Sequence, residues 1–133
     1  MPGTVVETKD KQGPIGVVTL TITADSADAS VPDTALATKI SGRLLALETD
    51  PGTTAPTALS DITLEDAEGH DVLEGVGADR SATATEKAAV VYSGTEIHPP
   101  VAKGDVLTFK LANNSVNSAG IVAKLYYEGA SDP

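Results

Sequence analysis

The sequence predicts an all-β protein, an antiparallel β-sandwich that is jelly-roll-like and has about seven or eight strands. Short runs of alternating apolar and polar residues are separated by clusters of Gly, Pro, Asp and Asn, which is typical of strands joined by turns. No segment has the pattern of a long helix. The 133 residues match a single domain with one hydrophobic core.

The first half of the chain predicts two strands. Residues 17–24 place Val18, Leu20 and Ile22 on one face and threonines on the other. Residues 25–38 are rich in Ala, Asp and Ser and predict a long loop. Residues 39–49 carry apolar side chains on both faces, which favours a central strand, although their periodicity is also compatible with a helix. The Asp-Pro-Gly turn at 50–52 ends this segment.

The second half predicts the remaining strands. Residues 61–65 and 70–73 form a predicted hairpin whose turn contains Gly69, a residue suited to a G1 bulge. Residues 74–86 are small and polar, and we expect a loop that crosses between sheets. Further strands are predicted at 88–92, 105–111 and 121–127, the second of them with Leu107, Phe109 and Leu111 facing inward.

The domain organisation follows from these elements. Residues 15–129 form the predicted sandwich, and residues 130–133 a flexible tail. Residues 1–14 are predicted to be an arm or an edge strand, because Val5 and Val6 are the only apolar pair among polar residues and Gly13-Pro14 separates them from the next strand. Such an arm could add to a sheet edge of a neighbouring subunit or of a capsid, so its candidate contact residues are Thr4, Val5, Val6 and Glu7.

Composition excludes several classes of function. Nine basic and nineteen acidic residues give a formal net charge of −10, which repels nucleic acid and anionic membranes. No apolar run approaches the roughly 20 residues that span a bilayer. The absence of cysteine excludes disulfides and thiolate chemistry. The first residues lack a signal-peptide pattern, so we expect synthesis and retention in a cytoplasm.

Two motifs are weighed as binding sites and both are interpreted as turns. Asp66, Glu68, His70 and Asp71 alternate oxygen ligands, but the spacing departs from a calcium loop, and no metal is predicted. Gly75-Val-Gly77 begins a dinucleotide fingerprint, but Arg80 stands where the third glycine belongs, and no cofactor is predicted.

Two histidines, His70 and His98, are candidate catalytic bases. No Gly-x-Ser-x-Gly elbow accompanies them and His98 precedes two prolines, so no catalytic residue is assigned and the protein is predicted not to be an enzyme. Asn113-Asn114-Ser115 matches a glycosylation sequon, which matters only in a secretory pathway.

Longer motifs resemble a family of small virion proteins of tailed bacteriophages. In that family a Pro-Gly loop precedes an Asp-hydrophobic-Thr strand, then an Asp-x-x-Gly-x-Asp-Val-Leu turn and a Gly-x-Gly-Ala-Asp-Arg loop, which resemble residues 49–57 and 61–80 here. Leu107-Thr-Phe-Lys-Leu and Gly120-Ile-Val-Ala-Lys-Leu-Tyr-Tyr are similar to the family's last two strands. The resemblance covers about two-thirds of the chain, and residues 92–103 and 128–133 depart from it.

This resemblance implies a head decoration (cement) protein on the capsid exterior, made in the host cytoplasm and bound to the major capsid protein. A homo-oligomer, with a trimer preferred, is expected. The alternative is a tail-associated or fibre-associated module that binds host glycan, against which the scarcity of Trp and Tyr argues mildly. A small hydrolase is a third hypothesis.

Overall fold

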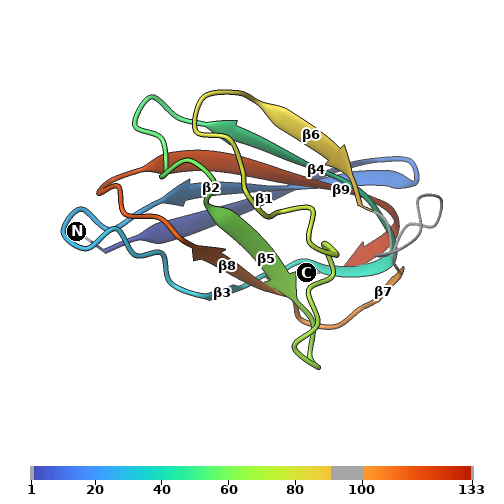
Figure 1. The fold of residues 1–133 in the computed structure, drawn as a ribbon. Helices are drawn as coiled ribbons and strands as arrows, with labels where there is room; N and C mark the ends of the chain where they lie inside the picture. Colours follow the sequence, from blue (N-terminus) through green and yellow to red (C-terminus); the bar gives the residue numbers. More distant parts are fainter. Residues whose placement is uncertain (1, 91–100, 133) are drawn as a thin grey trace.

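The computed structural model describes residues 2–90 and 101–132, which fold into two antiparallel sheets that face each other (Figure 1). The described residues contain no helix, so the predicted all-β sandwich is confirmed. The larger sheet has six strands in the order β1 (Thr4–Gln12), β2 (Ile15–Thr23), β9 (Gly120–Asp132), β4 (Lys39–Pro51) and β6 (Glu86–Ala89), with β7 (Val101–Lys103) also paired to β4. The smaller sheet has the order β3 (Thr34–Ala35), β8 (Thr108–Ala112) and β5 (Asp61–Glu65).

The chain passes repeatedly from one sheet to the other. After β2 it enters the smaller sheet at β3, returns to the larger one at β4, and then alternates through β5, β6 and β7, β8 and β9. The last strand, β9, therefore lies in the middle of the larger sheet, between β2 and β4. Except for the pair β1–β2, strands that are paired in the two sheets are distant from each other in the sequence.

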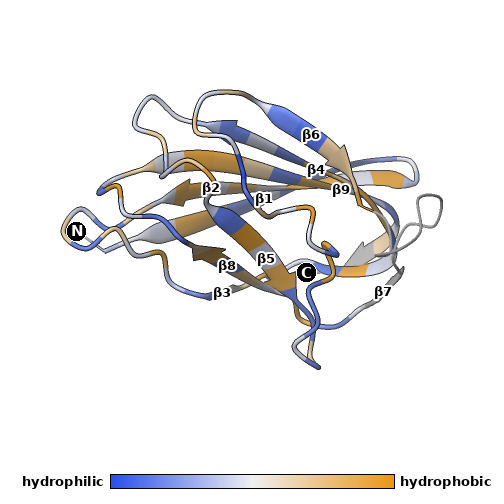
Figure 2. Cartoon of the chain, viewed as in Figure 1, coloured by the Kyte–Doolittle hydropathy of each residue, from blue (hydrophilic) through white to orange (hydrophobic). Residues whose placement is uncertain are grey.

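The core lies between the two sheets and is built from small aliphatic side chains. Alternation along each strand sends every second residue inward, and Figure 2 shows this alternation along β5. Phe109 and Tyr127 are its largest members. The others are aliphatic: Val18, Leu20, Ile22, Leu36, Ile40, Leu44, Leu47, Ile62, Leu64, Val72, Leu73, Val90, Leu107, Ile121, Ala123 and Leu125.

A close approach within the larger sheet involves Gly16 and Tyr127, which are opposite each other in the β2–β9 ladder. A Cβ placed on Gly16 would lie 2.2 Å from Cζ of Tyr127. The ring occupies the space that any other residue at position 16 would fill, so this glycine is required by packing.

The central strand predicted at residues 39–49 is confirmed as the long strand β4, and the helix alternative is wrong. Other predicted segments differ from the structure. The predicted hairpin is reduced to one Glu65–Asp71 bridge, because the chain turns away after Asp71, whose carboxylate accepts from the N–H groups of Leu64, Leu73 and Gly75. The other side of β5 pairs with β8. The strand predicted at 88–92 is β6, which begins two residues earlier and ends at Ala89, and Tyr92 lies outside the described residues.

Both ends of the described chain belong to the sandwich. Residues 130–132, expected to form a flexible tail, are the end of β9, and Ala130, Ser131 and Asp132 pair with Ser41, Ile40 and Lys39 of β4. At the other end, β1 pairs with β2 along its whole length, so the N-terminal segment is an edge strand of its own domain.

Candidate functional site

The N-terminal edge strand divides the four predicted contact residues between two faces of the larger sheet. Val5 lies opposite the buried Ile22 and packs against the core, and Glu7 lies opposite the buried Leu20. Thr4 and Val6 point the other way, and the Val6 side chain is 57% exposed. Of these four residues, only Thr4 and Val6 are therefore available to a partner on the outer face of the sheet.

Glu7 fixes the strand to the domain. Its carboxylate accepts hydrogen bonds from the backbone N–H groups of Ala37 (2.7 Å) and Thr38 (2.9 Å), which lie between β3 and β4. Hydrogen bonds to a charged acceptor are stronger than neutral ones. The sequence offered no sign of this contact because the partners are thirty residues apart.

The outer face of the six-stranded sheet points away from the smaller sheet and is the broader of the two outer sheet faces. We call one part of it the uncharged half; it consists of Thr4, Val6, Thr8, Thr19, Thr21, Thr23 and Val122, and Asp10 on β1 and Asp50 on β4 lie at its border. The other half carries Lys124, Glu48 and Lys87 in one cross-strand row. Opposite charges side by side in such a row attract each other.

Tyr126 lies within this outer face. Its hydroxyl donates to Oε1 of Glu48 (3.3 Å), and Nζ of Lys87 sits 4.0 Å from the ring centroid. Partial burial, followed by the negative charge of Glu48, raises the pKa of Tyr126. Because Lys87 covers the ring, Tyr126 does not present an open platform for stacking.

The acidic turn after β5 brings together two of the four residues considered for metal binding, Asp66 and Glu68, and adds Asp105, which the sequence did not indicate. Oxygens of Asp66, Glu68 and Asp105 lie within 4.8 Å of one another. Oδ1 of Asp66 accepts from the backbone N–H groups of Glu68 and His70, both at 3.0 Å. The positive φ of Gly69 (81°) matches its predicted place in a tight turn. The carboxylate of Asp66 thus shapes the turn.

Asp71 and His70 take part in the same turn. Asp71 accepts from the backbone N–H groups of Leu64, Leu73 and Gly75. The His70 imidazole contacts the carboxylate of Glu74, and this hydrogen bond raises the pKa of His70. His70 is an exposed turn residue, as the sequence predicted, and His98 lies outside the described residues.

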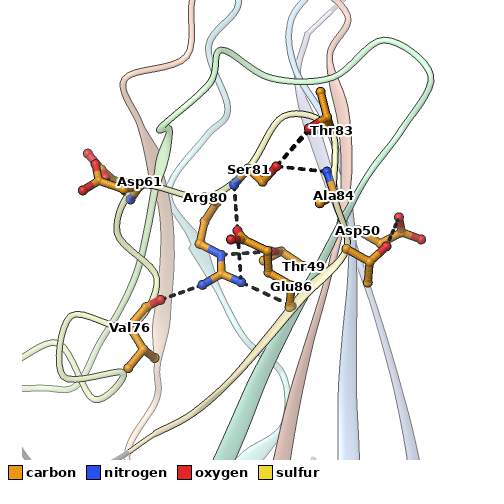
Figure 3. A network of polar contacts seen from close by, with 11 residues as sticks. Thr49, Asp50, Asp61, Val76, Arg80, Ser81, Thr83, Ala84 and Glu86 are labelled. Atoms are coloured by element: carbon orange, nitrogen blue, oxygen red, sulfur yellow. Dashed lines mark hydrogen bonds and ion pairs between the residues drawn. The ribbon is translucent and has the colours of Figure 1, made fainter.

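Arg80 forms a buried hydrogen-bond network that the sequence did not indicate. Its side chain is buried, and the guanidinium donates from Nε to Oγ1 of Thr49 (2.9 Å) and from its terminal nitrogens to the carbonyls of Val76 (2.8 Å) and Glu86 (3.2 Å). The Glu86 carboxylate lies 3.6 Å from the guanidinium and accepts from the N–H of Ser81 (Figure 3). Arg80 thus joins β4, β6 and the 74–80 loop.

The sequon region also has a structural role. The Asn114 side chain accepts from the N–H groups of Thr57 (3.0 Å) and Val116 (3.1 Å) and donates to the carbonyl of Ala29 (3.0 Å). It therefore ties three loops together at one end of the sandwich.

Comparisons with known proteins are sparse. No protein-family model matches the chain, and no curated protein matches it either. A chain in the solved capsid asymmetric unit of cyanophage Pam1 is similar over 97% of this chain and 87% of that one, at 16% identity and a TM-score of 0.40. No helix in the described residues is long and apolar enough to cross a membrane.

Proposed function

We propose that this chain is a non-enzymatic structural protein of a tailed-bacteriophage virion that decorates the outer surface of the head. The observation that carries the proposal is the outer face of the six-stranded sheet, a broad surface with an uncharged half of threonine and valine. A surface of this kind suits docking onto another protein, because few charges must lose water on contact.

The motifs that resemble those of small tailed-phage virion proteins support the same proposal. Residues 61–80 form the Asp71 turn and the Arg80 network, so they maintain the sandwich. Motif residues that maintain the fold and form no chemical site are expected in a protein whose role is to present a surface. The repeated passage of the chain between the two sheets further supports a jelly-roll-like topology.

The proposed partner is the major capsid protein, and the proposed location is the capsid exterior. The protein is expected to act as a homo-oligomer; the sequence led us to prefer a trimer, and a mass measurement in solution decides the number of copies. A tail-associated or fibre-associated glycan-binding module stays the alternative. Lys87 covers the Tyr126 ring, which weakens the case for a sugar platform there.

Binding to undecorated phage heads tests the proposal. The wild-type chain should co-sediment with heads and raise their disruption temperature. Thr21→Lys, which puts a charge in the uncharged half of the outer face, should reduce occupancy at least several-fold. Val106→Lys is the matched control, because Val106 is 44% exposed and is not on that face. Binding to host cells but not to heads would favour the alternative.

A further inference from the structure

The strand β1 has one open side. It is the outer strand of the six-stranded sheet and spans nine residues, whereas strands average about 5–6 residues. Among the described residues, no backbone–backbone hydrogen bond outside the β1–β2 ladder involves this strand, and only the Glu7 side chain accepts from the backbone of another segment. A long open edge is a template for another strand.

The β1–β2 turn determines which backbone groups face this edge. The turn has two residues, Gly13 and Pro14, and it closes on the Gln12–Ile15 pair. A two-residue hairpin closes with a hydrogen-bonded pair, and bonded pairs then alternate along the ladder. The even-numbered residues of β1 therefore bond to β2. The N–H and C=O groups of Val5, Glu7, Lys9 and Lys11 point toward the open edge.

We propose that β1 pairs antiparallel with β1 of a second copy of this chain, about a two-fold axis that passes through Thr8. In this register the strands overlap along their full length, and Glu7 of each copy lies opposite Lys9 of the other. A shift to the neighbouring register that preserves the faces places either Glu7 or Lys9 opposite itself. Like charges directly opposite each other are destabilising, so the charge pattern selects one register.

The charges on β1 agree with this pairing. The whole chain carries −10, so two copies repel each other, but Glu7, Lys9, Asp10 and Lys11 make β1 neutral. Lys9, Asp10 and Lys11 have no ion-pair partner in the part of the chain that the structure describes. Lysines on an edge strand usually prevent pairing with other chains. Here the register through Thr8 places Lys9 opposite Glu7. The Glu7 carboxylate keeps its hydrogen bonds to Ala37 and Thr38, so its negative charge attracts Lys9 without a new hydrogen bond.

The pairing defines an isologous dimer. The two six-stranded sheets become continuous across the two-fold axis, and the outer faces of both copies lie on the same side. This geometry gives a dimer where the sequence led us to prefer a trimer. It does not depend on the proposed virion role, because it concerns only contacts between copies of this chain.

Single cysteines test the register, because the chain has none of its own. Thr8→Cys should form an interchain disulfide under mild oxidation, because residues at a non-hydrogen-bonded pair have Cα atoms about 4.5 Å apart. Thr4→Cys should not crosslink to itself, since its two copies would be separated by roughly 26 Å. A mixture of Thr4→Cys and Gln12→Cys chains should crosslink, because these residues face each other across the axis.

Light scattering on the unmodified chain completes the test. We expect a mass near twice the 13.5 kDa of the monomer, and Lys9→Glu should weaken dimerisation at least about tenfold through repulsion by Glu7. Circular dichroism of Lys9→Glu should be unchanged, since Lys9 is exposed. A monomer, a trimer, or equal crosslinking of Thr8→Cys and Thr4→Cys would overturn the proposal.

Discussion

Nε of Arg80 donates a hydrogen bond of 2.9 Å to Oγ1 of Thr49, and both side chains are buried. Thr49 lies on the central strand β4, whereas Arg80 lies at the end of a loop and is bridged to Ser60 just before β5. The pair therefore connects the two sheets of the sandwich at the edge where β6 begins.

Arg80→Met should lower the free energy of unfolding by about 3 kcal/mol, because it leaves Thr49 and two backbone carbonyls without their donor. Denaturant unfolding measures the loss. Arg43→Met is the matched control, since the Arg43 side chain is 65% exposed in a 3.8 Å ion pair. Equal stability of the two variants would contradict the role given to Arg80.

Gly16→Ala should destabilise the protein by about 1–3 kcal/mol, because the new Cβ would overlap the ring of Tyr127. Thermal or denaturant unfolding gives the value. Gly120→Ala serves as the control on the same sheet, because its Cβ would meet nothing closer than 3.8 Å. A Gly16→Ala variant as stable as Gly120→Ala would refute the packing argument.

Tyr127→Phe should leave stability unchanged or raise it slightly. The Tyr127 hydroxyl is buried and has no hydrogen-bond partner among the described residues, so its removal relieves an unpaired polar group. Denaturant unfolding provides the measurement. A loss above about 1 kcal/mol would show that the hydroxyl is bonded in solution.

The contact with Glu74 raises the pKa of His70 above its ordinary value of 6.5. A raised pKa in the folded state means that the stabilising contribution is complete below the unfolded pKa and is lost as pH rises through the folded pKa. Wild type should therefore exceed His70→Gln in melting temperature at about pH 5, and the two should converge at about pH 9. An NMR titration that places the His70 pKa at or below 6.5 would contradict this.

Chelation should leave folding unchanged. Asp66 already accepts two backbone hydrogen bonds in its turn, so the turn needs no ion to hold its conformation. The melting temperature should be the same with and without EDTA. A drop of more than a few degrees would show that Asp66, Glu68 and Asp105 hold a cation.

The strands were predictable wherever one face is buried. Apolar residues recur at every second position around Val18, Leu20 and Ile22, and again from Ile121 to Tyr127, and these residues are the buried ones. The sequence could not assign strand partners, because β5 pairs with β8 across about fifty residues while the local turn at Gly69 predicted a hairpin. The pairing of β5 with β8, where Leu64 lies opposite Phe109, depends on the folded core and not on neighbours in the sequence.

The candidate site was harder to predict. The residue types around Asp66 and His70 predicted a turn with an exposed histidine, because turn formation depends on neighbours in the sequence. The bonds of Glu7 to Ala37 and Thr38, and of Arg80 to Thr49, join residues about thirty positions apart. No spacing rule relates such residues, so only the folded chain shows them.

The position of β9 between β2 and β4 has a consequence for biosynthesis. While the ribosome is still making residues 120–132, the strands β2 and β4 have no strand between them, and the hydrophobic sides of both strands lack their β9 neighbour. The sandwich can therefore assemble only after β9 has emerged from the exit tunnel. A nascent chain stalled before β9 should be a substrate for chaperones and proteases.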